Sequence, residues 1–213
     1  MDITLDHIMP TPLKSIEHGS DSIWGNHVKL EDGKRILLNA SSGKGKTTFL
    51  TTAYGLRKDY TGEIRYGDEN ITDFTPDRWT EIRMNEVSVV FQDLQLFQKL
   101  SVGENLLLKN SLTDIYTESE LKTLLGELEI EHKWDQKCGL LSMGQQQRVA
   151  IIRALAQPYT WLIMDEPYSH LDVDNAKRCM NLIHERTIAQ NAGFVLTTLG
   201  DSHGYKYDQE LKL

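Results

Sequence analysis

Four short apolar runs constrain the fold of this chain more than any other feature. The runs are Arg35–Asn39, Val87–Phe91, Trp161–Met164 and Phe194–Thr197. A strand with one face in water alternates apolar and polar residues, but these runs are apolar almost throughout. Continuous runs of this kind are typical of strands that are buried on both faces. They therefore predict a mostly parallel sheet that is covered by helices.

Segments with helical signals lie between these runs. Thr117 to Glu120 form a capping box, and the leucines that follow fall on one helical face. A second helix is expected from about Ser142 to Ala156, ending before Pro158. A third helix should begin near Asp172. The alternation of apolar runs with helices indicates an α/β fold.

The chain of 213 residues is long enough to bury a sizeable core, and no linker divides it. We therefore predict a single domain over residues 1–213. The segment Gly62–Ile71 alternates enough to predict a hairpin, which indicates an antiparallel β region in the amino-terminal part. The stretch between the second and third apolar runs predicts an inserted helical subdomain at about 95–155.

Composition excludes several classes of protein. The formal net charge of −8 argues against nucleic acid as a partner. The longest apolar stretches have four residues, too few for a membrane-spanning helix, and the first residues lack the apolar core of a signal peptide. Cys138 and Cys179 fit no metal-binding or disulfide pattern. We therefore expect a cytoplasmic protein.

A glycine-rich segment follows the first apolar run. Residues 40–47 match the end of the phosphate-loop pattern Gly-x-x-x-x-Gly-Lys-Ser/Thr, with Ala40 in place of the first glycine. Glycines let backbone N–H groups turn toward phosphate oxygens, Lys46 adds positive charge, and the Thr47 hydroxyl can bind Mg²⁺. The alternative is a turn that merely connects a strand to a helix. The expected nucleotide-binding residues are Ser42, Gly43, Lys44, Gly45, Lys46, Thr47 and Thr48.

Two carboxylates follow the third apolar run. Asp165 and Glu166 stand where a phosphate-loop enzyme needs a partner for Mg²⁺. Asp165 is expected to hold the metal, directly or through water, which leaves Glu166 to polarise an attacking water. The alternative is a solvated strand end with an acid that caps a helix. Together with the glycine-rich segment, the two carboxylates predict a phosphate-loop NTPase core.

The segment Leu141–Arg148 is the most diagnostic part of the chain. It reads Leu-Ser-Met-Gly-Gln-Gln-Gln-Arg, and with the two preceding motifs it resembles the ATP-binding cassette (ABC) ATPases, whose signature is Leu-Ser-Gly-Gly-Gln. Only Met143 departs from that signature. The resemblance extends from about Leu30 to Leu213. From the residues themselves, Ser142 and Gln145 predict a capping box that opens a helix suited to bind a terminal phosphate.

The resemblance implies that ATP is the substrate, with Mg²⁺ as its metal. In the family, two cassettes sandwich two nucleotides, and the signature of one cassette reaches the ATP of the other. The residues implied to bind nucleotide in this way are Ser142, Gly144 and Gln145. Gln92 matches the glutamine loop, which senses Mg²⁺ and nucleotide. The implied metal ligands are Thr47, Gln92 and Asp165, and the implied catalytic residues are Glu166 and Gln92.

At other positions this sequence matches the family pattern less completely. Asp172 matches the loop that crosses the dimer interface, although its simpler role is to cap the following helix. Thr198 stands where the family has a switch histidine, and His203 follows five residues later. This difference implies slow but not absent hydrolysis. Trp24 and His18 are both candidates for stacking on adenine, and neither is assigned.

The segment Phe91–Asn105 looks like the cassettes of lipoprotein-release and macrolide-export systems. In such systems the surface around the glutamine loop receives a membrane subunit. Leu94, Leu96 and Phe97 either serve that contact or pack inside the helical insertion. The expected partners are a second cassette, identical or different, and an integral membrane transporter subunit, which would hold the protein at the inner face of the membrane.

The predicted function is therefore ATP binding and hydrolysis by a cassette that dimerises and powers a separate transporter subunit. Two alternatives stay open. One is an ABC ATPase of a soluble assembly complex. The other is a weakly hydrolysing regulatory cassette that pairs with an active one.

Overall fold

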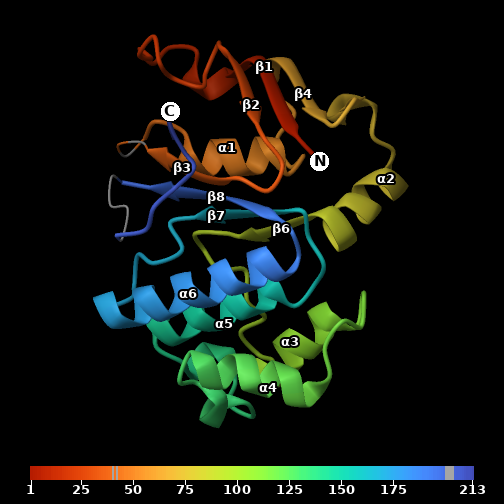
Figure 1. The fold of residues 1–213 in the computed structure, drawn as a ribbon, viewed down its shortest axis with the longest axis vertical. Helices are drawn as coiled ribbons and strands as arrows, with labels where there is room; N and C mark the ends of the chain where they lie inside the picture. Colours follow the sequence, from red (N-terminus) through yellow and green to blue (C-terminus); the bar gives the residue numbers. More distant parts are fainter. Residues whose placement is uncertain (40, 42, 200–203) are drawn as a thin grey trace.

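A parallel sheet forms the centre of the molecule (Figure 1). The computed structural model describes residues 1–39, 41, 43–199 and 204–213. The strands of the sheet are β3 (Arg35–Asn39), β6 (Val87–Val90), β7 (Trp161–Asp165), β8 (Gly193–Thr198) and β9 (Gln209–Lys212). Their order across the sheet is β6–β7–β8–β3–β9, and all neighbouring pairs are parallel. The prediction that the four apolar runs form a parallel sheet is confirmed.

Neighbouring residues of the central strands belong to opposite cores. In β3, Leu37 packs with the core on one face of the sheet, and Ile36 and Leu38 pack with the core on the other. In β7, Met164 packs with the same core as Leu37, and Ile163 packs with the same core as Ile36. These strands therefore have no face in water, which accounts for their continuous apolar sequences.

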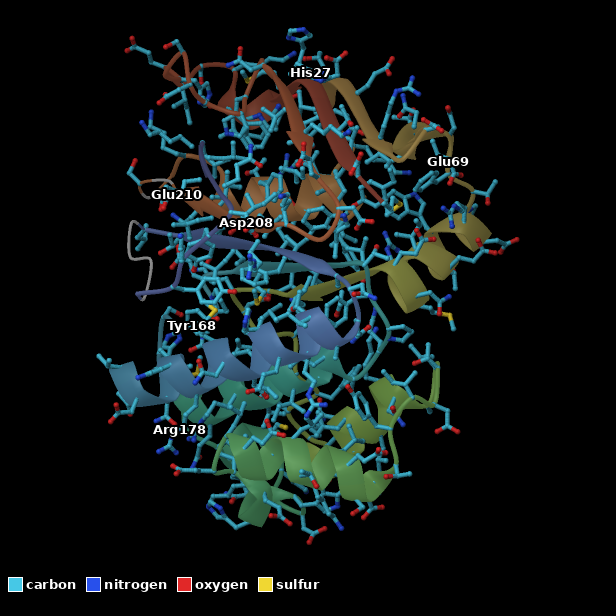
Figure 2. All side chains as sticks on the ribbon, in the orientation of Figure 1. His27, Glu69, Tyr168, Arg178, Asp208 and Glu210 are labelled. Atoms are coloured by element: carbon cyan, nitrogen blue, oxygen red, sulfur yellow. The ribbon has the colours of Figure 1, made fainter. Side chains whose placement is uncertain are left out.

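Sequence patterns did not predict β9. This strand lies at the edge of the sheet beside β3, where charged residues are tolerated because alternate side chains reach solvent. Arg35 fixes its start, donating to Asp208 from Nε at 2.6 Å and from Nη2 at 2.7 Å. The guanidinium lowers the pKa of Asp208 to about 2. Figure 2 marks Asp208 at this edge.

The amino-terminal part forms a second, antiparallel sheet. Its strands are β1 (Ile3–Pro10), β2 (His27–Leu30), β4 (Tyr60–Tyr66) and β5 (Glu69–Asn70), in the order β2–β1–β4–β5. β4 and β5 pair as a hairpin, which confirms the prediction for Gly62–Ile71. In β1, Ile3, Leu5 and Ile8 are buried, and they face the same core as Ile36.

Helices separate and cover the two sheets (Figure 1). α1 (Lys46–Ala53) lies between the antiparallel and the parallel sheet, and α5 (Met143–Leu155) and α6 (Val173–Ala189) cover the opposite face of the parallel sheet. α3 (Val102–Asn110) and α4 (Glu118–Glu127) lie beyond α5. α2 (Pro76–Glu81) continues into a π turn, Ile82–Glu86. Short 3₁₀ turns span Thr11–Leu13, Ile71–Asp73, Glu131–Lys133 and Cys138–Leu140.

The predicted helix starts are confirmed by their caps. Thr117 and Glu120 form the capping box of α4, and Ser142 and Gln145 form that of α5. Asp172 caps α6 by accepting a hydrogen bond from the Asn175 N–H at 2.8 Å. Hydrogen bonds from Asn175 lower the pKa of the Asp172 carboxyl. The three helices therefore begin where the sequence predicts.

The segment that follows β6 decides between the two interpretations of its apolar residues. Leu94 and Leu96 are buried in the core that contains α3, α4 and α5, whereas Phe97 is 53% exposed. The prediction of an exposed contact surface is therefore wrong for the two leucines and stays open for Phe97. In the described ranges, no helix has the length and apolar character needed to cross a membrane.

Candidate nucleotide site

The phosphate loop leads from β3 into α1. Ala40 and Ser42 lie outside the described residues. Gly43 and Gly45 have φ angles of 80° and 104°, in the left-handed region that glycine adopts without strain. Gly45 is the N-cap of α1, and Lys46 is the first residue of that helix. The helix start directs backbone N–H groups and partial positive charge toward the loop, as phosphate binding requires.

Trp24 packs against this loop from the interior. Its side chain is 3% exposed, and its Nε1–H donates to the Lys44 carbonyl oxygen at 3.1 Å. The peptide unit is planar, so this hydrogen bond also orients the Gly45 N–H. A buried indole offers no face to a base, which leaves adenine stacking unassigned. His18 Nε2 donates to the Leu13 carbonyl at 3.0 Å and is not assigned to adenine either.

Gly45→Ala is expected to destabilise the protein more than Gly43→Ala. A Cβ on Gly45 would lie 2.6 Å from Leu13 Cδ1 and 3.2 Å from the Trp24 ring, whereas a Cβ on Gly43 would meet nothing within 4 Å. Left-handed backbone costs either alanine about 1–2 kcal/mol, and the collision adds to that cost only at Gly45. Urea denaturation measures the loss in free energy of unfolding for each variant. Equal losses would show that the loop moves away from Leu13 and Trp24 without cost.

Oxygen atoms of Thr47, Gln92 and Asp165 converge beside the loop. Thr47 Oγ1 donates to Asp165 Oδ2 at 2.5 Å and lies 3.4 Å from Gln92 Oε1. Asp165 is 1% exposed. A hydroxyl, an amide oxygen and a carboxylate are hard ligands, which Mg²⁺ binds together with substrate phosphates. The chemistry of these three donors therefore fits a magnesium ion.

Thr197 completes this group, and sequence reasoning missed it. Its Oγ1 donates to Asp165 Oδ1 at 2.6 Å, so the two carboxylate oxygens accept from two threonines. The register places Thr197 opposite Asp165 on neighbouring strands. The position of Thr197 follows from the strand order, which one sequence does not give.

Glu166 turns out of β7 toward Lys46. Glu166 Oε1 lies 3.3 Å from Lys46 Nζ, and the lysine side chain is 7% exposed. The φ angle of Glu166 is 47°, a left-handed conformation that strains a residue with a side chain and that occurs often at functional sites. Its N–H donates to the Thr197 carbonyl at 3.2 Å. The strand end thus holds a carboxylate and an ammonium beside the phosphate loop.

The segment after Glu166 is anchored in the core. Tyr168 is buried, and its hydroxyl donates to Met180 Sδ at 3.6 Å. Figure 2 shows this tyrosine between the parallel sheet and α6. Burial raises its pKa well above the usual value. This anchor limits how far the backbone next to Glu166 can move.

The signature forms the start of α5. Ser142 Oγ accepts from the Gln145 N–H at 3.3 Å, and Gln145 Oε1 accepts from the Ser142 N–H at 3.0 Å. A Cβ on Gly144 would lie 2.8 Å from the His170 carbonyl oxygen, so glycine is required for this close approach. Met143, which departs from the signature, is exposed.

Gln147 joins the signature helix to Glu166. Its buried side chain donates from Nε2 to the Glu166 carbonyl at 3.2 Å and accepts at Oε1 from the His170 N–H at 2.9 Å. Sequence reasoning did not assign a role to this residue. The contact depends on α5 packing against the segment that follows β7, and spacing alone does not predict it.

Thr198 ends β8 near the same site. It is 6% exposed and lines a cavity of about 230 Å³ together with Glu166 and Leu199. His203, the other residue considered for this position, lies outside the described residues. Thr48 follows Thr47 in the first turn of α1, where its carbonyl accepts from the Thr52 hydroxyl at 2.7 Å.

Comparison with known proteins identifies the family. The family model described as ABC transporter matches residues 25–169, which is more than half of the chain. The chain belongs to the ABC transporter family. Its relatives include the lipoprotein-releasing system ATP-binding protein LolD of Saccharophagus degradans, 28% identical over 82% of this cassette and 78% of that protein. The putative hemin import ATP-binding protein HrtA of Staphylococcus haemolyticus is 31% identical over 93% of this cassette and 90% of its own length.

Solved structures agree with this assignment. The dimeric structure of MJ0796, a bacterial ABC transporter cassette, superposes with a TM-score of 0.84 and 26% identity, covering 99% of this cassette and 94% of that chain. A second structure of MJ0796 is a dimeric post-hydrolysis state bound to ADP and Pi, with a TM-score of 0.80 and 25% identity, covering 98% of this cassette and 96% of that chain. The protein is an ABC ATPase cassette homologous to transporter ATP-binding subunits.

Proposed function

We propose that this cassette hydrolyses ATP between two cassettes and drives a separate membrane transporter subunit. One observation carries the hydrolytic part of the proposal. The Lys46–Glu166 contact of 3.3 Å lies next to the Thr47–Asp165 hydrogen bond of 2.5 Å, so a phosphate-binding cation, metal-binding oxygens and a second carboxylate meet at one strand end. Proteins of this family are generally ATP hydrolases.

Each residue at this strand end has a distinct proposed task. The glycines of the loop let backbone N–H groups bind the phosphates, and Lys46 neutralises charge on the β- and γ-phosphates. Glu166 orients the water that attacks the γ-phosphorus. Mg²⁺, held by Thr47, Gln92 and Asp165, supplies further charge neutralisation when bound. ATP must separate Lys46 from Glu166, because the phosphate takes the place of the carboxylate beside the ammonium group.

The separation of the two helix starts that are proposed to bind phosphate supports a dimer. α1 and α5 lie on opposite faces of the parallel sheet (Figure 1). A nucleotide on the loop before α1 is therefore proposed to meet Ser142, Gly144 and Gln145 of a second cassette. Asp172 is proposed to lie in the same interface. The dimeric structure of the MJ0796 cassette supports this arrangement.

A membrane subunit is the proposed second partner. Large apolar side chains remain exposed in and around α3; they are Phe97, Leu107, Leu108, Leu112 and Ile115. Exposed apolar patches are typical of interaction sites. We propose that residues 95–155 form a helical subdomain that presents this surface, and that the cassette is held at the inner face of a membrane. The relatives LolD and HrtA, which are ATP-binding proteins of transport systems, support this assignment.

A regulatory cassette is the second candidate. Thr198 favours it, because threonine cannot carry the positive charge that a histidine offers near a γ-phosphate. Such a cassette would bind ATP in a heterodimer and leave most hydrolysis to its partner. Turnover of the purified chain alone separates the two candidates.

Glu166→Gln is expected to produce an ATP-dependent dimer. The substitution keeps the binding residues and removes the carboxylate that orients water, so the ATP-bound dimer should accumulate. Light scattering should show dimers with Mg-ATP and monomers with ADP. Adding Ser142→Ala should weaken the dimer while leaving ATP affinity of the monomer nearly unchanged. A Glu166→Gln protein that stays monomeric at high concentration with saturating ATP would contradict the proposal.

A further inference from the structure

The chain turns sharply just after Gln92. Leu94 and Gln95 have φ angles of 61° and 49°, so two consecutive residues other than glycine occupy the left-handed region. This conformation is strained and persists only where surrounding contacts maintain it. Local contacts contribute: Leu94 N–H donates to the Phe91 carbonyl at 3.0 Å, and the Leu94 side chain is buried. A further contact reaches this turn from a different element.

Arg153, in the last turn of α5, holds the turn by its backbone. Its Nη1–H donates to the Gln95 carbonyl at 2.7 Å, and its Nη2–H donates to the Leu94 carbonyl at 2.9 Å. The planar guanidinium presents these donors at a fixed angle. It therefore fixes the directions of two consecutive carbonyl groups, and with them the path of the strained turn.

The charge of Arg153 is compensated by these carbonyl groups. Burial lowers the pKa of the guanidinium, which nevertheless stays charged. Arg153 makes no ion pair with a carboxylate in the part of the chain that the structure describes. Burial and the charge of Arg153 together lower the pKa of the Lys109 ammonium group. An apolar side chain would fill this place without the cost of a half-buried cation, so the two hydrogen bonds are the contribution specific to arginine.

The loop is tied to α5 at a second place. Gln98 Nε2 donates to Gln146 Oε1 at 3.2 Å, near the start of the helix. Ser88 of β6 donates to the Ala154 carbonyl at 2.6 Å, so the end of the helix is also held against the strand that precedes Gln92. Residues on both sides of Gln92 therefore contact the helix that begins at the signature.

We propose that Arg153 is a positioning residue that makes the Gln92 loop follow the movement of the signature helix. The helix has 13 residues and spans about 20 Å at 1.5 Å per residue, so a displacement at Ser142 reaches Arg153 with little loss. The guanidinium then passes the displacement to the carbonyl groups of the turn. This proposal rests on the proposed function, because it takes Gln92 and Ser142 to act on the nucleotide.

A double-mutant cycle tests the proposal. Arg153→Lys keeps the charge, but an ammonium group cannot hold both carbonyl groups in the same plane. This variant should lower kcat for ATP by about tenfold, the typical loss for a charge-assisted hydrogen bond, and leave KM within about twofold. Because Arg153 acts through Gln92, Arg153→Lys combined with Gln92→Ala should be no slower than Gln92→Ala alone. If the losses in kcat of the two single variants added up in the double variant, or if Arg153→Lys left kcat unchanged, the proposal would be overturned.

A matched control separates positioning from general stability. Arg186, on α6, donates from Nη2 to Glu127 at 3.2 Å and links two other helices. Arg186→Lys should lower the Tm by an amount similar to Arg153→Lys but leave kcat unchanged. A loss of kcat that follows Tm in both variants would assign Arg153 a structural role only and overturn the proposal.

Hydrogen exchange tests the contact independently of ATP hydrolysis. In the nucleotide-free protein, Arg153→Lys should raise amide exchange in residues 93–98 by about tenfold, while Arg186→Lys should not. Unchanged exchange would overturn the proposal even if the cassette is an active ATPase. Faster exchange in a protein without measurable ATPase activity would support the contact and place the failure in the proposed function.

Discussion

Replacement of Glu166 by Gln is expected to lower kcat for ATP hydrolysis by about 10²–10⁴-fold, because the amide cannot accept a proton from the attacking water. The carboxylate lies 3.3 Å from Lys46 Nζ, so the substitution also removes an attraction that ATP must otherwise break. Affinity for ATP should therefore stay the same or rise. Phosphate release at saturating Mg-ATP measures kcat, and calorimetry measures affinity.

The same substitution elsewhere on the chain provides the control. Glu185 is exposed on α6, so Glu185→Gln should change neither kcat nor ATP affinity. If Glu166→Gln retained kcat within about threefold of the original protein, a different group would orient the water. If instead ATP affinity fell strongly, the carboxylate would contribute to binding rather than to chemistry.

Most of the central sheet could be predicted because its strands are buried on both faces. The runs in β3, β6, β7 and β8 are apolar for that reason, and their sequences differ sharply from the segments around them. β9 could not be predicted from an apolar run, because an edge strand tolerates charged residues such as Glu210 and Lys212. Helix starts were predictable since a capping box is a local pattern, and the caps at Thr117 and Ser142 depend only on neighbouring residues.

From the residues alone, the candidate site was predictable only where its residues are close in sequence, whereas Gln92, which lies 3.4 Å from Thr47, was predicted from the family resemblance. Lys46 and Thr47, or Asp165 and Glu166, stand together in motifs whose spacing indicates phosphate chemistry. Trp24, Thr197 and Gln147 reach the same site from other elements, and each depends on a tertiary contact. The spacing of residues in the sequence does not predict such contacts.

The signature helix is connected to both parts of the site. Near its start, Gln147 bonds to the Glu166 carbonyl at 3.2 Å, and at its end Arg153 bonds to the turn after Gln92. Tyr168 anchors the segment that follows Glu166 in the core. In the proposed dimer, docking of a second cassette on Ser142 would therefore act through one helix on Glu166, which is proposed to orient water, and on the turn after Gln92.

Thr198→His is expected to raise kcat by about 100–1,000-fold, the usual contribution of one donor to developing charge in a transition state. Threonine is shorter than histidine and cannot become cationic. Thr198 and Glu166 line the same cavity of about 230 Å³, so a donor at position 198 would face the space next to the Glu166 carboxylate. Affinity for ATP should change little, because the binding residues of the phosphate loop are unaltered. Steady-state phosphate release by the purified cassette measures the gain.

Thr198→Leu is the matched control for this gain. Leucine has similar bulk to histidine but no donor, so it tests whether filling a site that is 6% exposed changes turnover by itself. The Tm of both variants should fall by a similar amount, since both enlarge a buried side chain at the end of β8. An equal change in kcat for the two variants would mean that packing, not a hydrogen bond, limits hydrolysis. A high kcat in the original protein that Thr198→His leaves unchanged would mean that another group already supplies the donor, and the slow turnover that Thr198 implies would be wrong.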